Sequence, residues 1–231
     1  DPVAGSLCAW GGFQCPFRSQ QAFAHVLRMP TDRIRVSATD IGGAFGNKIQ
    51  CWKHAVVCLA AKLTRRPVKW VESHREFIVT GPHQRDVLWS GTAAFKEDGR
   101  LLGIKARFVQ DLGVEISNRS YAAASLVAAC GAVPNAYRLK GMEIDAYGVG
   151  TNKPSYGAYR GYGKDKGIKV MERIIDWVAL ECRLSPEEVR FRNFIPSDRF
   201  PYRQITNYVY DSGNYPALME QLLNLADIPS W

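Results

Sequence analysis

The sequence lacks the motifs of several large classes of protein. Its six cysteines form no Cys-x-x-Cys pair, and no spacing of cysteine and histidine matches a zinc or iron–sulfur site. No apolar run approaches the length that crosses a bilayer, and Asp1 is not followed by the basic and apolar regions of a secretory signal. We therefore expect a cytoplasmic chain without disulfides and with no membrane partner, in which Cys51 and Cys58 share the buried face of a predicted helix. A start at Asp1-Pro2, just before a predicted strand, is typical of the middle of a longer polypeptide.

Common phosphate and nucleic-acid motifs are missing as well. In the glycine-rich segment 42–48, Asn47 stands where a Walker loop has glycine, and Ile49 follows the lysine where that loop has serine or threonine. The segment also lacks the G-x-G-x-x-G dinucleotide fingerprint. The formal charge of +8 comes with no helix-turn-helix, zinc-finger or RNP-like motif. We expect no nucleic-acid partner, and a basic nucleic-acid binder is the weakest interpretation of this chain.

The pattern of apolar residues predicts an α+β fold. With 231 residues, of which 46% are apolar and 23% are charged, the composition is that of a globular protein with a real core. Apolar alternation and turn residues predict strands at 6–10, 34–38, 67–71, 87–97, 101–113 and 141–150. Helical spacing and caps predict helices at 16–29, 49–63, 164–183, 186–194 and 215–226. We expect a mixed β-sheet with helices packed on it, followed by an irregular segment at 196–214.

Two glycine-rich loops carry the strongest functional signal. The first loop covers residues 40–48 and follows the strand predicted at 34–38. The second loop covers residues 151–163. The second loop places four glycine or proline residues and three tyrosines around Arg160, directly before an amphipathic helix. Glycine lets a backbone approach a ligand closely, and a helix start supplies free N–H groups for anionic oxygens. The two loops therefore indicate a ligand site.

Both loops resemble those of one family, the molybdenum-cofactor-binding subunit of xanthine dehydrogenases, aldehyde oxidoreductases and carbon monoxide dehydrogenases (large chain). The resemblance rests on Gly42-Gly43-Ala44-Phe45-Gly46-Asn47-Lys48 and on Ala158-Tyr159-Arg160-Gly161-Tyr162-Gly163. Weaker ordered matches, such as Arg66-Pro67-Val68-Lys69 and Tyr210-Asp211-Ser212-Gly213, extend it over nearly the whole chain. By this resemblance, residues 1–195 are the first cofactor-binding region. Residues 196–231 are an irregular segment plus a helix that lead toward a missing second half.

The resemblance implies a molybdenum hydroxylase that oxidises an aldehyde or an N-heterocycle with oxygen derived from water. The implied cofactor is molybdopterin with molybdenum, for which the cytosine dinucleotide form is one candidate. Iron–sulfur clusters and FAD are expected on partner chains. The implied partners are the remaining half of the molybdenum subunit, an iron–sulfur subunit, a FAD subunit and a small-molecule substrate.

The resemblance also assigns site residues. Gln14 matches a glutamine that donates a hydrogen bond to an oxo ligand of molybdenum, which would stabilise negative charge there. Tyr162 matches an aromatic residue that stacks on substrate, although a core aromatic that plugs the loop is an equal alternative. The positions implied to contact the cofactor, largely through their backbone, are Gly42, Gly43, Ala44, Phe45, Gly46, Ala158, Tyr159, Arg160 and Gly161.

Departures from the family pattern limit the activity. Gly161 stands where carbon monoxide dehydrogenases have a cysteine, and Ile49 and Ala128 stand where xanthine enzymes have purine-binding residues. Both carbon monoxide and purines are therefore disfavoured as substrates. No Gly-Glu dipeptide occurs, so the catalytic glutamate is expected outside this chain, which should not turn over substrate alone. The alternative is a non-catalytic ligand-binding or subunit-assembly module that retains the fold.

Overall fold

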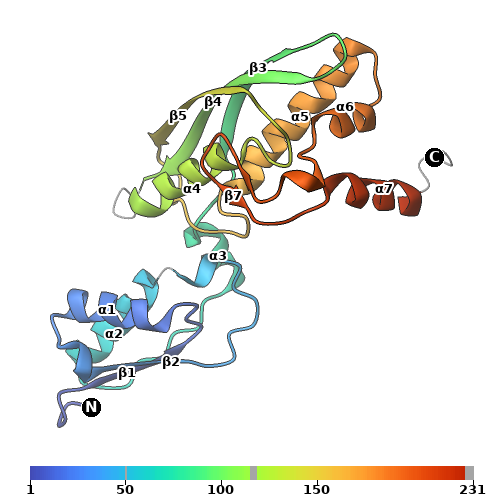
Figure 1. The fold of residues 1–231 in the computed structure, drawn as a ribbon. Helices are drawn as coiled ribbons and strands as arrows, with labels where there is room; N and C mark the ends of the chain where they lie inside the picture. Colours follow the sequence, from blue (N-terminus) through green and yellow to red (C-terminus); the bar gives the residue numbers. More distant parts are fainter. Residues whose placement is uncertain (50, 115–118, 227–231) are drawn as a thin grey trace. The chain divides into compact units, whose positions relative to one another are not determined.

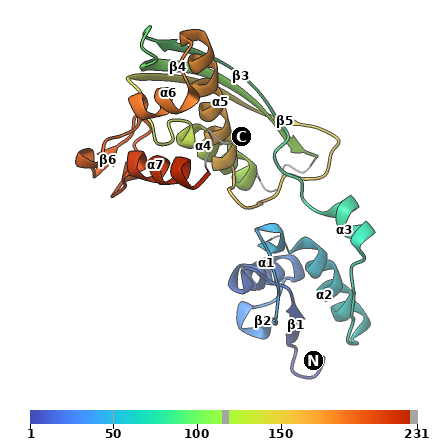
Figure 2. The same ribbon diagram turned by 90° about the vertical axis from the view of Figure 1, so that its right-hand side faces the viewer.

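The computed structural model describes residues 1–49, 51–114 and 119–226, which fold into two compact units. The first unit contains residues 1–84 and 152–160, with the segment that begins at Gly113. The second unit contains the other described residues. Figure 1 and Figure 2 show helices and strands in each unit, which confirms the predicted α+β class.

The first unit is a small parallel β–α–β element with additional helices. Strand β1 (Leu7–Gly11) pairs in parallel with β2 (Ile34–Ala38), and helix α1 (Pro16–Leu27) connects them. Helix α2 (Trp52–Thr64) packs on β1 and α1, while the short α3 (His74–Thr80) begins at a capping box formed by Ser73 and Glu76. The core consists of Leu7, Ala9, Phe13, Phe23, Leu27, Ile34, Ala55 and Cys58.

The second unit is a three-stranded sheet covered by helices. Its strands lie in the order β3 (Val87–Phe95), β4 (Leu101–Gly113) and β5 (Gly141–Gly150), with β3 antiparallel to β4. The long helix α5 (Lys164–Cys182) packs on β3, and α4 (Arg119–Ala132) packs on α5 and β5 (Figures 1 and 2). The core includes Phe108, Met171, Ile174, Ile175 and Val178.

The rest of the second unit continues this arrangement. Helix α6 (Pro186–Asn193) packs on α5, and a small antiparallel pair joins β6 (Tyr202–Arg203) to β7 (Val209–Tyr210). Helix α7 (Tyr215–Ala226) follows, with the predicted bounds. Parallel and antiparallel pairings thus both occur, in separate sheets. The predicted boundary at residue 195/196 concerns cofactor binding, which the compact units do not address, and it stays a prediction.

Several secondary-structure expectations differ from the structure. The segment 196–214, expected to be irregular, contains the β6–β7 pair. The predicted strand at 67–71 is wrong, because none of the described strands pairs with this segment. Helices α3 and α4 were not predicted. The Ser73-x-x-Glu76 capping signal for α3 is present in the sequence, whereas the many small residues of α4 show little helical periodicity. Within the described ranges, no helix combines the length and hydropathy needed to span a membrane.

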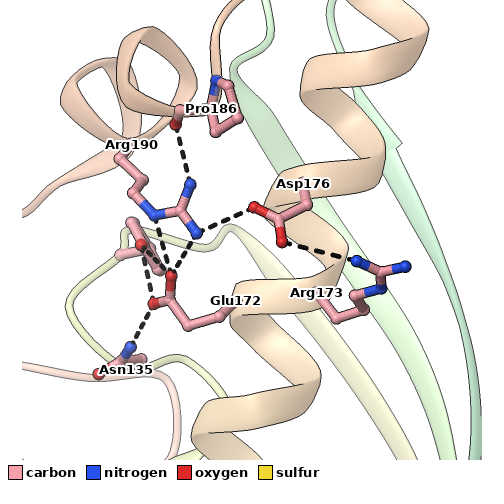
Figure 3. A network of polar contacts seen from close by, with 7 residues as sticks. Asn135, Glu172, Arg173, Asp176, Pro186 and Arg190 are labelled. Carbon is pink, nitrogen blue, oxygen red and sulfur yellow. Dashed lines mark hydrogen bonds and ion pairs between the residues drawn. The ribbon is translucent and has the colours of Figure 1, made fainter. Parts of the chain in front are cut away.

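A polar network joins α6 to α5 (Figure 3). The guanidinium of Arg190 donates to Glu172 Oε2 (Nε, 3.0 Å) and to Asp176 Oδ1 (Nη2, 3.0 Å). Glu172 Oε1 also accepts hydrogen bonds from Asn135 Nδ2 (2.7 Å) and Tyr137 Oη (2.9 Å). Burial and the neighbouring Glu172 carboxylate raise the pKa of Tyr137, so its hydroxyl stays a donor. Arg190 therefore neutralises two carboxylates of α5 at the α6 contact.

We expect Arg190→Met to lower the free energy of unfolding by about 2 kcal/mol, because it leaves Glu172 and Asp176 without their shared cation. Arg173→Met is the matched control, since Arg173 also meets Asp176, at 3.9 Å, but its side chain is 59% exposed. The control should cost less than about 0.5 kcal/mol. Urea denaturation of both variants measures the difference. Equal losses would show that the network adds nothing beyond an exposed ion pair.

Candidate functional site

Gln14 lies just after β1 on a well-anchored backbone. The preceding Phe13 is 2% exposed and packs edge-on against Phe23, with ring centroids 5.9 Å apart. The ring of His54, which lies on α2, is 4.6 Å from the ring of Phe13. The backbone N–H of Gln14 donates to the carbonyl of Lys48 at 3.0 Å. The buried phenylalanine and this hydrogen bond together hold the Gln14 peptide beside the first glycine loop.

The orientation of the Gln14 side-chain amide follows from its hydrogen bond. Its Oε1 accepts the backbone N–H of Gly46 at 3.0 Å, and only the oxygen of an amide can do this. The Nε2 group is thereby left to point elsewhere, and it donates to none of the described residues. Gln14 therefore presents two N–H donors at an exposed position.

The first loop, residues 40–48, presents a row of backbone N–H groups at residues 42–45. Gly42 (φ +59°) and Gly46 (φ +103°) adopt conformations that favour glycine, and Phe45 lies in the left-handed region at φ +53°. In the described part of the chain, no acceptor takes the backbone N–H of Gly42, Gly43, Ala44 or Phe45. Lys48 closes the loop, because its Nζ donates to the carbonyl of Ile41. The loop thus offers donors suited to anionic oxygens.

The first loop and residues 158–160 of the second loop are joined in the first unit. The backbone N–H of Arg160 donates to the carbonyl of Phe45 at 2.9 Å, and its guanidinium lies 5.9 Å from the centre of the Phe45 ring. The rings of Tyr159 and Phe45 are 6.3 Å apart. At Gly46 the backbones are so close that a Cβ would lie 2.5 Å from the Ala158 carbonyl oxygen. Only glycine fits at this junction.

A short β-bridge anchors the second loop, and no sequence pattern predicts it. His83 N–H donates to Ser155 O at 3.1 Å, and Gly157 N–H donates to His83 O at 3.0 Å, around the parallel pair His83 and Tyr156. Tyr156 is 4% exposed. This bridge lies two residues before Ala158 and fixes the segment that reaches the first loop. No local motif announces it, because its partners are 73 residues apart in sequence.

Nine of the predicted site residues thus share the first unit, and two do not. Gly161 and Tyr162 belong to the second unit, where they form the turn before α5. Their φ angles are +100° and +48°, and Gly161 O accepts the N–H of Lys164 at 3.1 Å. The predicted stacking of Tyr162 on substrate therefore stays a prediction. Among the described residues, no group of three histidine, cysteine or acidic side chains could hold a metal ion.

Charged groups surround the start of α5 in the second unit. Arg85 Nε contacts Asp165 Oδ2 at 2.7 Å, and Asp165 Oδ1 accepts the N–H of Gly163 at 3.2 Å. The next residue, Lys166, is 5% exposed and donates to the buried Gln110 Oε1 at 2.7 Å. Burial lowers the pKa of Lys166 from 10.5 to about 8, against the opposing effect of Asp165. The first turn of α5 therefore contains a buried lysine whose basicity is lowered.

The pH dependence of stability should reveal this lysine. Since its pKa is lower in the folded state, the folded chain binds fewer protons between pH 8 and 10.5, and its free energy of unfolding rises over that range. The pKa difference corresponds to roughly 3 kcal/mol. We expect this rise in the wild type relative to Lys166→Met, in which other titrations are unchanged. Urea denaturation at pH 7.5 and 10.5 measures it, and parallel curves for the two proteins would contradict it.

Comparisons with known proteins show the family of this chain. The model of the molybdopterin cofactor-binding domain matches residues 1–194. The carbon monoxide dehydrogenase large chain of Hydrogenophaga pseudoflava is 31% identical over all of this chain and 29% of its own length.

Two solved structures are similar. Carbon monoxide dehydrogenase from Oligotropha carboxidovorans has a TM-score of 0.88 and 29% identity over 98% of this chain and 28% of that one. Quinoline 2-oxidoreductase from Pseudomonas putida 86 has a TM-score of 0.86 and 26% identity over 96% of this chain and 28% of that one. The chain thus spans less than a third of the length of these relatives. It belongs to the family of molybdopterin cofactor-binding domains.

Proposed function

We propose that this chain forms one wall of the molybdopterin site of a molybdenum hydroxylase. The observation that carries the proposal is the pairing of Gln14 with Gly46, which places a free amide donor beside a loop of free backbone N–H groups. Both features lie within the region that the cofactor-binding family model matches. The proposed substrate is an aldehyde or an N-heterocycle.

The residues fit a bulky anionic cofactor. A Cβ at Gly42 would meet no atom within 4 Å, so the space beside this part of the loop is open. The exposed N–H groups of residues 42–45 can donate to the oxygens of a pterin or of a phosphate. Arg160 adds a cation over the Phe45 ring at the edge of the same loop. When bound, the cofactor supplies the two-electron redox chemistry of the hydroxylation.

The chain's own contribution is to bind and orient. Gln14 Nε2 is positioned to donate toward an oxygen of the bound cofactor or substrate, and Gly46 keeps its amide from rotating. Residues 158–160 hold the first loop in place through the hydrogen bond from Arg160 to Phe45. On the resemblance alone, Gly161 is proposed to contact the cofactor and Tyr162 the substrate. The proton acceptor for the reaction is proposed to be a glutamate outside this chain.

The finer assignments are also proposals. The name of one relative includes quinoline, an N-heterocycle, which supports that substrate class. Gly161 in place of the cysteine expected of carbon monoxide dehydrogenases argues against carbon monoxide, despite the similarity to such enzymes. The term large chain in a relative's name supports partner subunits, for which we propose iron–sulfur and FAD carriers. The cytosine dinucleotide form of the cofactor is proposed on the resemblance alone.

The test is to purify the complete protein that contains this chain, with its partners. We expect stoichiometric molybdenum and pterin, and oxidation of an aldehyde or N-heterocycle with an artificial acceptor, whereas the 231-residue chain alone should show no turnover. Arg160→Ala should lower molybdenum content more than it lowers the rate per molybdenum. A complete protein that contains neither molybdenum nor pterin would instead support a non-catalytic module.

A further inference from the structure

A basic pocket lies in the second unit, within one compact body. Its volume is about 680 Å³, which is within the range of small-molecule sites. None of the described residues that line the pocket carries a carboxylate. Five of them carry cationic side chains, namely Lys96, Arg100, Arg138, Lys140 and Arg192. They come from the β3–β4 turn, the segment before β5 and the end of α6. The proposed cofactor wall, in the first unit, uses none of them.

The positive charge of this pocket is incompletely balanced. Arg100 meets Asp98 at 3.5 Å, and Arg192 meets Glu188 at 3.6 Å, so two of the five cations have only long contacts with carboxylates. The Nζ groups of Lys96 and Lys140 have no ion pair or hydrogen bond with any described residue. Like charges gathered in a concave surface raise the local positive potential, which attracts anions.

The floor of the pocket is rigid. Asn193 is 3% exposed; its Oδ1 accepts the N–H of Leu101 at 2.8 Å, and its Nδ2 donates to Gly99 O at 2.9 Å. The N–H of Arg138 donates to Asn193 O at 3.0 Å. One buried residue therefore holds the three cation-bearing segments together, the β3–β4 turn through its side chain and the segment before β5 through its backbone carbonyl. Such preorganisation lowers the entropy lost when a ligand binds.

We propose that this pocket binds a small molecule carrying two or more phosphate groups. Five cations carry more positive charge than a single phosphate can balance, whereas linked phosphates supply more negative charge and more acceptor oxygens. Tyr202, which also lines the pocket, offers an aromatic face to an organic part of the ligand. This inference does not rest on the proposed hydroxylase function, because its residues and unit are separate.

Calorimetric titration of the 231-residue chain with inorganic pyrophosphate tests the proposal. We expect binding that weakens as salt is added and that is tighter than binding of inorganic phosphate. Lys96→Glu combined with Lys140→Glu should raise the Kd by about 100-fold, or roughly tenfold for each charge-assisted contact. The double Lys→Gln variant at the same positions should show a smaller rise in Kd. Melting temperatures establish that both variants are folded.

Two controls separate this pocket from other anion sites. Lys169→Glu reverses an exposed lysine of α5 outside the pocket and should leave the Kd within about twofold, since distant surface charges are screened. Arg160→Ala removes a cation at the first glycine loop and should also leave it unchanged. Lack of pyrophosphate binding, or loss of it in Arg160→Ala but not in the lysine variants, would overturn the proposal. So would tighter binding of a polyglutamate peptide, which would assign the pocket to an acidic protein segment.

Discussion

Replacing Gly46 with alanine should lower the free energy of unfolding by roughly 2–4 kcal/mol and abolish cofactor retention in the complete protein. At φ +103° an alanine is strained, and its Cβ would lie 2.5 Å from the Ala158 carbonyl oxygen. Because that oxygen is backbone, it cannot rotate away as a side chain could. The two loops must separate, which also breaks the hydrogen bond from Gly46 to Gln14.

Gly42→Ala is the matched control for this prediction. Gly42 has φ +59°, so alanine there carries left-handed strain as well, but a Cβ would meet nothing within 4 Å. We expect a cost of about 1 kcal/mol and at most a partial loss of molybdenum, because the two loops stay joined although the methyl group enters the open space beside the loop. Denaturation curves and molybdenum content of both variants decide the matter. If Gly46→Ala behaved like Gly42→Ala, the close contact of the loops would have no role in cofactor binding.

The structure makes Gly43 a less suitable position than Gly46 for testing the first loop by substitution. From the sequence alone, each glycine of the first loop is an equal candidate for close approach to a ligand. In the structure Gly43 has no positive φ, and a Cβ there would meet the Phe45 ring at 2.6 Å. That ring is 53% exposed and can shift, so a substitution at Gly43 reports partly on Phe45. Gly46, against a fixed carbonyl, is the sharper probe.

Local sequence signals predicted helices and strands well where residues close in sequence determine the structure. Alternation and turn residues located β2 and β5, and helical spacing located α7. The strand predicted at 67–71 failed because alternation says nothing about whether a partner strand exists. The bridge between His83 and Tyr156 could not be predicted, since it depends on contacts between segments far apart in sequence.

The residues of the candidate site also divide into those that the sequence reveals and those that only the structure reveals. Their glycine content revealed the two loops, and the resemblance to one family added Gln14. The first unit brings Gln14 and the first loop together with residues 158–160. The role of Lys48 was missed, although it closes the first loop through its side chain and holds Gln14 through its carbonyl. A lysine at a loop end has no pattern that separates such a structural role from ligand binding. Only the side-chain geometry makes the distinction.

Gln14 has two separable roles, and two substitutions distinguish them. Gln14→Ala removes both the acceptor for Gly46 N–H and the free donor, whereas Gln14→Glu retains an acceptor and removes the donor. If the donor stabilises an oxygen that gains charge during the reaction, kcat of the complete enzyme should fall by about 10²–10³ in both variants. Only Gln14→Ala should also lose stability, by about 1 kcal/mol.

Gln20→Ala supplies the reference for this pair. Gln20 lies in the same unit and donates from Nε2 to the carbonyls of Thr31 (3.1 Å) and Ile34 (2.6 Å), so its loss costs hydrogen bonds away from the loops. We expect Gln20→Ala to lower the melting temperature without changing kcat per molybdenum. Steady-state kinetics normalised to molybdenum content, together with melting temperatures, give the outcome. Full activity in Gln14→Glu would mean that Gln14 only positions Gly46. Equal behaviour of Gln14→Ala and Gln20→Ala would remove Gln14 from the site, because the cost would then be that of any lost hydrogen bond in this unit.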